Sequence, residues 1–80
     1  MNIGEAVKER ILELCRERDI SINKLCSMSG VTQSTVNNII SGRNRSATVS
    51  TVKKLCDGLG ITIEDFFHSP LFRDLEQEIQ

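Results

Sequence analysis

The stretch SINKLCSMSGVTQSTVNNIISG, residues 21–42, carries two short helical patterns separated by a turn signal. Ser21 and Thr32 are each suited to cap a helix, because their hydroxyls can accept hydrogen bonds from the free N–H groups of its first turn. Gly30 is suited to end the first helix in the left-handed backbone conformation. Apolar residues recur at helical spacing in both halves, namely Ile22, Leu25, Cys26 and Met28, then Val36, Ile39 and Ile40. The stretch therefore predicts two helices joined by a tight turn.

The second of these helices has an unusual polar side. Residues 30–44 contain no acid and no aromatic residue. At 100° per residue, the positions away from the apolar stripe carry amides and hydroxyls, from Gln33, Ser34, Asn37, Asn38 and Ser41. Such groups both donate and accept hydrogen bonds, which suits a surface that reads another molecule. Alternatively, the amides on this side of the helix contact only water and have no binding role.

A longer helix is predicted before this pair, ending at about Arg18. Asn2 can cap it, and Glu5 follows three residues later at the spacing of a capping box. Apolar residues then recur at steps of four, four and three, at Ile3, Val7, Ile11 and Leu14. This spacing predicts one buried stripe.

Two helices are predicted after the pair. Thr48 can cap the first of them, which ends at Gly60 and carries an inward stripe of Val52, Leu55, Cys56 and Leu59. Thr62, with Asp65 three residues later, can cap a short fifth helix that ends at His68. A histidine there is mildly favoured, since the end of a helix attracts positive charge.

A final helix is predicted from Ser69 and Pro70, a cap followed by proline at the first helical position. One side of this segment carries Leu71, Phe72, Leu75 and Ile79. We therefore predict an all-α fold, with five helices in residues 1–68 and an amphipathic C-terminal helix in residues 69–80.

The charges are distributed unevenly along the 80 residues, although the net charge is only −1. All eleven acids lie in residues 5–19 or 57–78. Between Ile20 and Cys56 the charged residues are all basic, namely Lys24, Arg43, Arg45, Lys53 and Lys54. A basic segment that includes the helix pair favours a nucleic-acid partner more than the net charge does.

Several other classes of function are disfavoured. Cys15, Cys26 and Cys56 are isolated and odd in number, which fits a reducing compartment. With His68 they could formally bind zinc, but no short ligand spacing is present, so we expect buried thiols and no metal site. One histidine, no paired carboxylates on a common face and no glycine-rich phosphate loop disfavour an enzyme, so no catalytic residue, cofactor or small-molecule ligand is predicted.

The chain also lacks the marks of a membrane or exported protein. No apolar run approaches the roughly 20 residues that a membrane span needs. The first ten residues, MNIGEAVKER, lack the apolar core of a signal peptide. We therefore expect a cytoplasmic protein with no membrane partner.

Two short helices packed by apolar residues around a glycine-containing turn are typical of a helix-turn-helix. The chain resembles the Cro/repressor type of this motif, found in the Xre-like transcriptional regulators. The resemblance covers roughly residues 3–67 and rests on I-x-x-L at 11–14 and on residues 21–26, 30–36, 39–43 and 48–61. It implies that residues 1–68 form a five-helix lambda-repressor-like DNA-binding domain, whose third helix, residues 33–41, enters the major groove.

The resemblance also implies roles for individual residues. Base edges would be read by Gln33, Ser34 and Asn38, with Asn37 joining them or touching a phosphate. The sugar-phosphate backbone would be met by Thr32, Ser41, Arg43, Asn44, Arg45 and Thr48. The chain departs from many relatives at Ile22, where a glutamine often binds phosphate, and at Ser46-Ala47, where Asn-Pro is common. The predicted function is sequence-specific binding of double-stranded DNA by a transcriptional repressor.

Two alternatives remain open at this stage. Fold does not determine function, so the domain could instead be a protein-interaction module, antitoxin-like or anti-repressor, with weak or no DNA binding.

A second question concerns the oligomer. One reading helix distinguishes few base pairs, so we expect a homodimer through Phe66, Leu71, Phe72, Leu75 and Ile79. The alternative for this stripe is packing on the core of its own chain, against the first helix.

Overall fold

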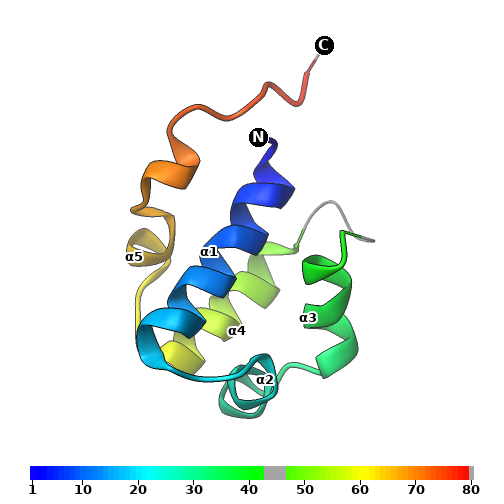
Figure 1. Cartoon of the computed structure of the whole chain (residues 1–80), viewed down its shortest axis with the longest axis vertical. Coiled ribbons are helices and arrows are strands. Elements are labelled where there is room, and N and C mark those ends of the chain that lie inside the picture. The colour runs from blue at the N-terminus through cyan, green and yellow to red at the C-terminus, as the bar shows by residue number, and fades with distance from the viewer. Residues whose placement is uncertain (43–46, 80) are drawn as a thin grey trace.

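The computed structural model describes residues 1–42 and 47–79, and within them it is all-α, as predicted. The helices are α1 (Ile3–Arg18), α2 (Ile22–Ser29), α3 (Gln33–Ile40), α4 (Val49–Leu59) and α5 (Ile63–Phe67). A single 3-10 turn, η1 (Pro70–Phe72), follows them. Figure 1 shows α1 and α4 in the centre of the view, with α3 on the right, α2 below and α5 on the left. No helix in these two ranges is both long enough and apolar enough to cross a membrane.

The predicted caps set the helix boundaries. Asn2 and Glu5 form the capping box of α1, in which each side chain accepts a hydrogen bond from the other residue's backbone N–H. Four further N-caps each accept from the backbone N–H three residues later, namely Ser21, Thr32, Thr48 and Thr62. The turn between α2 and α3 depends on Gly30, whose φ of 66° is left-handed and would strain other residues.

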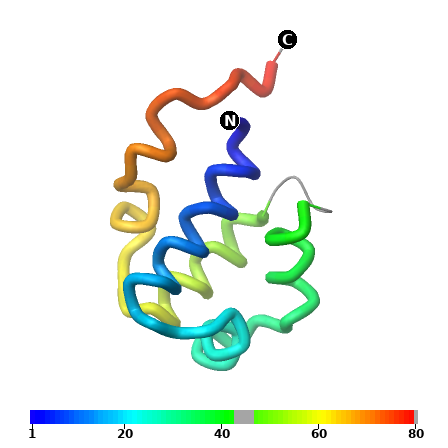
Figure 2. Tube along the Cα trace, viewed as in Figure 1, coloured from blue at the N-terminus to red at the C-terminus, as the bar shows by residue number. Residues whose placement is uncertain are grey.

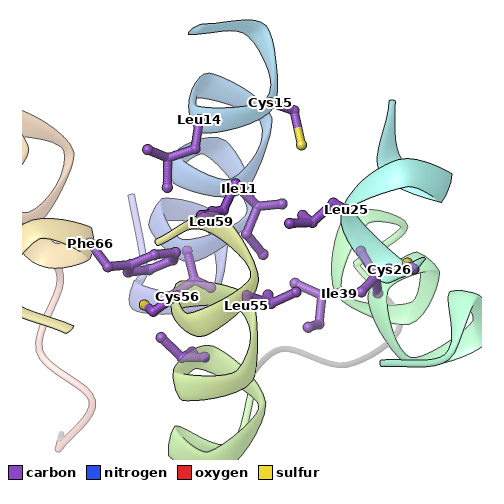
Figure 3. Close-up of a cluster of buried hydrophobic side chains, with 13 residues drawn as sticks. Ile11, Leu14, Cys15, Leu25, Cys26, Ile39, Leu55, Cys56, Leu59 and Phe66 are labelled. Carbon is purple, nitrogen blue, oxygen red and sulfur yellow. The ribbon is translucent and has the colours of Figure 1, made fainter. Parts of the chain in front are cut away.

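One hydrophobic core lies between the helices, and Figure 3 shows side chains from all five helices meeting in it. The stripes predicted for α1 and α4 are buried, except that Ile3 is only partly covered. The three cysteines are free and buried, as predicted. Burial raises the pKa of each thiol, because the charged thiolate loses its solvation.

Met28, one of the four apolar residues noted in the sequence of α2, lies outside the core, because its side chain is 42% exposed. The apolar residues of α2 that do contact the core are Ile22, Leu25 and Cys26. At 100° per residue, Met28 points roughly 110° away from the mean direction of those three. Of the apolar residues in the pattern, Met28 therefore lies off the side of α2 that faces the core.

Arg10 ties α1 to the end of α5, a contact between distant residues that no local pattern predicts. Its Nε donates to the carbonyl of Phe66 at 2.7 Å, and its Nη2 donates to the carbonyl of Asp65 at 2.8 Å. Its Nη1 also pairs with the carboxylate of Glu13. The charged guanidinium thus satisfies the Phe66 carbonyl at the end of α5 and shares the Asp65 carbonyl with the backbone N–H of His68.

The C-terminal helix predicted for residues 69–80 is wrong beyond Phe72. Ser69 caps and Pro70 opens the segment as predicted, but only the 3-10 turn forms. The chain then runs past the N-terminus, where the backbone N–H of Glu76 donates to the carbonyl of Met1 at 3.2 Å (Figure 2). A helix of this length is marginal in water without a surface to cover, and here the backbone N–H of Glu76 bonds to Met1 instead of to a carbonyl within a helix.

The aromatic residues at this end correct the predicted dimer surface. Phe66 is completely buried, so it cannot contact a second copy. Its ring centroid lies 6.3 Å from that of Phe72, which packs against the core. Phe72 therefore packs as in the alternative prediction, in which the apolar stripe of the C-terminal segment covers the core of its own chain instead of a second copy. Leu71, Phe72 and Leu75 are half-buried, while Ile79 is 85% exposed.

Candidate nucleic-acid interface

The position of α3 follows from two buried side chains. Val36 and Ile39 are 0% and 5% exposed and belong to the core cluster, and Ile40 packs against it. The helix lies at the edge of the bundle in Figure 1. The four predicted base-reading residues lie outside the buried stripe, with Gln33, Ser34 and Asn37 exposed and Asn38 half-buried.

Hydroxyl groups surround the start of α3. Thr32 is exposed, and its Oγ1 accepts from the N–H of Thr35 at 3.3 Å. The same oxygen lies 2.9 Å from Thr35 Oγ1 and 3.4 Å from Ser34 Oγ. These contacts orient the Thr32 hydroxyl beside N–H groups of the first turn that have no partner within the helix.

Two other residues predicted to contact the DNA backbone lie on either side of residues 43–46, which are outside the described structure. Ser41 is exposed at the end of that helix, and its Oγ donates to the carbonyl of Asn38 at 3.4 Å. Thr48 is exposed at the start of α4, and its Oγ1 donates to Thr51 Oγ1 at 2.9 Å. The predicted contacts of Arg43, Asn44 and Arg45 lie outside the described residues.

The first turns of the helices differ in charge. Neither α2, α3 nor α4 has an acid in its first turn, whereas α1 has Glu5 and α5 has Glu64 and Asp65. A helix N-terminus carries partial positive charge that an acid would neutralise. The helix-turn-helix and the helix after it therefore keep N-termini that suit a phosphate.

The basic residues between Ile20 and Cys56 differ in whether they form an ion pair with an acidic side chain. Lys53 forms an ion pair with Asp57 one turn along α4, and both side chains are more than half exposed. The hydrogen bond to Asp57 raises the pKa of Lys53. Lys24 of α2 and Lys54 of α4 are exposed. The sequence count of basic residues therefore overstates the contribution of Lys53.

The residues of the zinc alternative do not form a cluster. Cys15, Cys26 and Cys56 are buried on three different helices, and His68 is exposed, where it caps the end of α5 as predicted. Within the part of the chain that the structure describes, no three His, Cys, Asp or Glu residues are grouped to hold a metal ion.

A five-helix bundle whose second and third helices are joined by a glycine turn, with an acid-free polar side on the third, defines a helix-turn-helix DNA-binding domain. The chain belongs to the family described as the Cro/C1-type HTH DNA-binding domain, whose sequence profile matches residues 10–69. This family is non-enzymatic and binds DNA. The resemblance to Xre-like proteins is thereby confirmed.

A solved structure has a similar fold over nearly the whole chain. The chain is similar to the crystal structure of the prophage Lp1 protein 11, with 37% sequence identity and a TM-score of 0.81. The similarity covers 94% of this chain and 100% of that chain. No curated protein matches the sequence.

Proposed function

We propose that the protein is a transcriptional repressor that binds double-stranded DNA sequence-specifically, with α3 in the major groove. One observation carries the proposal: α3 is fixed by the buried Val36 and Ile39 and turns an acid-free set of amides and hydroxyls outward. Membership of a DNA-binding family supports it.

The side chains on α3 have the chemistry that base reading needs. The amides of Gln33, Asn37 and Asn38 can each donate and accept at once, which matches the N6 and N7 atoms of adenine. The hydroxyl of Ser34 can serve either a donor or an acceptor on a base edge. Four such groups on one short helix can distinguish a few base pairs.

Contacts to the sugar-phosphate backbone would set the register of α3. The N-termini of α2, α3 and α4 offer N–H groups, and the hydroxyls of Thr32, Ser41 and Thr48 lie near the ends of α3 and the start of α4. Arg43, Asn44 and Arg45 add two charges and an amide from the segment that joins α3 to α4. Such contacts position a protein without reading sequence.

The proposal includes a homodimer, because a symmetric pair places two reading helices about 34 Å apart on one side of DNA. Of the residues predicted to form its interface, Phe66 is excluded by burial. The remaining candidates are Leu71, Phe72 and Leu75, each half-buried, and the exposed Ile79.

Selection of bound sequences from a random DNA pool tests this function. We expect a consensus of two inverted half-sites with centres about 10 base pairs apart. Failure to enrich any sequence would contradict base reading and favour the protein-interaction alternative. A single unrepeated half-site would support base reading and contradict the dimer.

Replacing Gln33 or Asn38 with alanine should weaken binding to the selected site by about 1–3 kcal/mol each, or roughly 5–150-fold. The loss should be smaller on a scrambled duplex, because only base contacts are removed. Fluorescence anisotropy on both duplexes measures the difference. Glu17→Ala is the control, since it truncates an exposed side chain near the end of α1 that has no proposed contact with DNA or with a second copy. Unchanged affinity in both α3 variants would remove them from the reading surface.

Replacing Arg43 or Arg45 with alanine should instead weaken binding to all sequences alike. Removing one phosphate contact should reduce the slope of log affinity against log salt by about one unit. Titrations at several salt concentrations measure this slope. Arg16→Ala removes an exposed arginine from the last turn of α1 and should leave the slope unchanged. Weaker binding confined to the selected sequence would make these arginines base readers.

A further inference from the structure

The polar side of α3 carries amides and hydroxyls but no ionic group. The sequence of the helix, QSTVNNII, includes no Arg, Lys, Asp or Glu. Gln33 and Asn37 are exposed and Asn38 is half-buried, so all three amides lie at least partly in solvent. Each amide presents a donor group and an acceptor oxygen side by side. This set of side chains is selective in the bases with which it can pair.

The composition of α3 limits which base edges it can match in the major groove. Guanine presents two acceptors, O6 and N7, and Arg or Lys supplies the donors that match them. Cytosine presents the N4 donor, from which Asp or Glu accepts. Adenine presents a donor at N6 beside an acceptor at N7, and the amide of Asn or Gln matches both. Of these three pairings, the side chains of α3 can form only the one with adenine.

The positions of the amides along α3 suit neighbouring base pairs. Asn38 lies about 25° from the direction opposite the side that packs on the core, closer than either of the other two amides. Gln33 and Asn37 lie one turn apart on one flank of the helix, separated by about 6 Å along its axis. Base pairs stack about 3.4 Å apart, so this separation corresponds to roughly two base-pair steps. The three amides can therefore contact different base pairs of one short site.

Guanine in place of adenine would leave such an amide poorly matched. The amide NH2 can donate to O6 or N7, but the amide oxygen then faces no donor, because guanine has none on this edge. A polar group that loses water without gaining a partner weakens binding. We therefore expect each change from an A·T to a G·C pair at a contacted position to reduce affinity by about 5–150-fold.

We propose that the base pairs facing α3 are A·T pairs, with adenines paired to the amides of Gln33, Asn37 and Asn38. This inference rests on the proposed function and names the bases that the same surface reads. The observation that carries it is the presence of three adenine-matching amides on a helix without one ionic side chain. The adenines can lie on either strand, because the amides project in different directions around the helix.

Replacing single adenines in the selected DNA tests the proposal with the full chain. Each adenine of a half-site is exchanged in turn for 7-deazaadenine, in which carbon replaces N7 and pairing with thymine is kept. We expect the affinity of the unmodified protein, measured by fluorescence anisotropy, to fall by about 2–10-fold at each adenine that an amide contacts, because one hydrogen bond is lost. The Asn38→Ala protein should no longer respond at one of these adenines, because it lacks the partner of that N7.

Two controls accompany this measurement. The Glu17→Ala protein should respond to every 7-deazaadenine as the unmodified protein does, because Glu17 is exposed near the end of α1 and has no proposed contact with DNA. A 7-deazaadenine placed outside the two half-sites should leave the affinity of the unmodified protein unchanged, because no amide of α3 reaches it.

Two results would overturn the assignment of adenine and leave the proposed function intact. The first is a selected sequence with G·C pairs at the positions where Gln33→Ala or Asn38→Ala relaxes the base preference. The second is a selected sequence of A·T pairs in which 7-deazaadenine never changes the affinity, since the shape of A·T-rich DNA would then be recognised in place of its base edges. A random pool that yields no preferred sequence would instead contradict the proposed function, and the assignment of adenine with it.

Discussion

Replacing Phe66 with alanine should lower the free energy of unfolding by about 3–5 kcal/mol. Its side chain is fully buried, and its ring meets that of Phe67 edge-on at 5.0 Å between centroids. Removing the ring leaves a cavity among α1, α4 and α5 that these helices cannot close. A domain of 80 residues has a total stability of roughly 4–12 kcal/mol, so this loss is a large share of it.

Urea denaturation followed by circular dichroism measures the loss. Phe67→Ala is the matched control, because the adjacent ring is 38% exposed and its removal should cost clearly less. Equal effects of the two substitutions would contradict the central position of Phe66. A stable Phe66→Ala variant that fails to dimerise would restore the interface role that burial argues against.

Replacing Gly58 with alanine should lower the free energy of unfolding by about 2 kcal/mol. A Cβ on Gly58 would lie 2.2 Å from Ser29 Oγ and 2.9 Å from Ser29 Cα. The hydroxyl can rotate away, but the Cα can move only if α2 moves, and α2 makes its most extensive contact with α4. We place the packing cost at about 3 kcal/mol, the upper end of the usual range, and the better helix propensity of alanine offsets about 1 kcal/mol of it.

Ser29 provides the companion experiment, again by urea denaturation. Its hydroxyl is buried without a hydrogen-bond partner in the described structure. Ser29→Ala should therefore leave stability unchanged or raise it, because an unsatisfied polar group is removed. Adding Ser29→Gly to Gly58→Ala should recover part of the lost stability, because it removes Ser29 Oγ and Cβ from the contact. The recovery should be incomplete, because the contact with the Cα of residue 29 remains. If Gly58→Ala stabilises the protein, helix propensity outweighs packing at this crossing.

Local signals in the sequence were sufficient to predict the five helices and to predict which side of α3 is buried. The caps at Asn2, Ser21, Thr32, Thr48 and Thr62 act on backbone groups within three residues. Periodicity along one helix likewise distinguishes its buried side from its exposed side, as it did for α4 and for the amides of α3. Caps and periodicity depend on residues that are close together in the sequence. They can therefore be recognised without knowing how the helices pack against one another.

The predicted site depended on both kinds of information. The sequence alone placed Gln33, Ser34, Asn37 and Asn38 outside the buried stripe of α3. It could not show that Lys53 is paired with Asp57, because an i, i+4 spacing permits an ion pair without requiring one. The available basic charge near α3 and α4 was therefore overcounted.

Only the tertiary structure shows that the C-terminal segment forms no helix beyond Phe72 and that Phe66 is buried. The spacing of Leu71, Leu75 and Ile79 suits a helix, but whether a helix forms depends on the surface offered to it. Here Phe72 packs on the core and the Glu76 N–H bonds to Met1, more than seventy residues away in sequence. Phe66 and Phe67 are adjacent and chemically identical, and the positions of α1 and α4 determine which one is buried. Contacts between residues distant in the chain depend on how the helices pack, and a local sequence pattern does not contain that information.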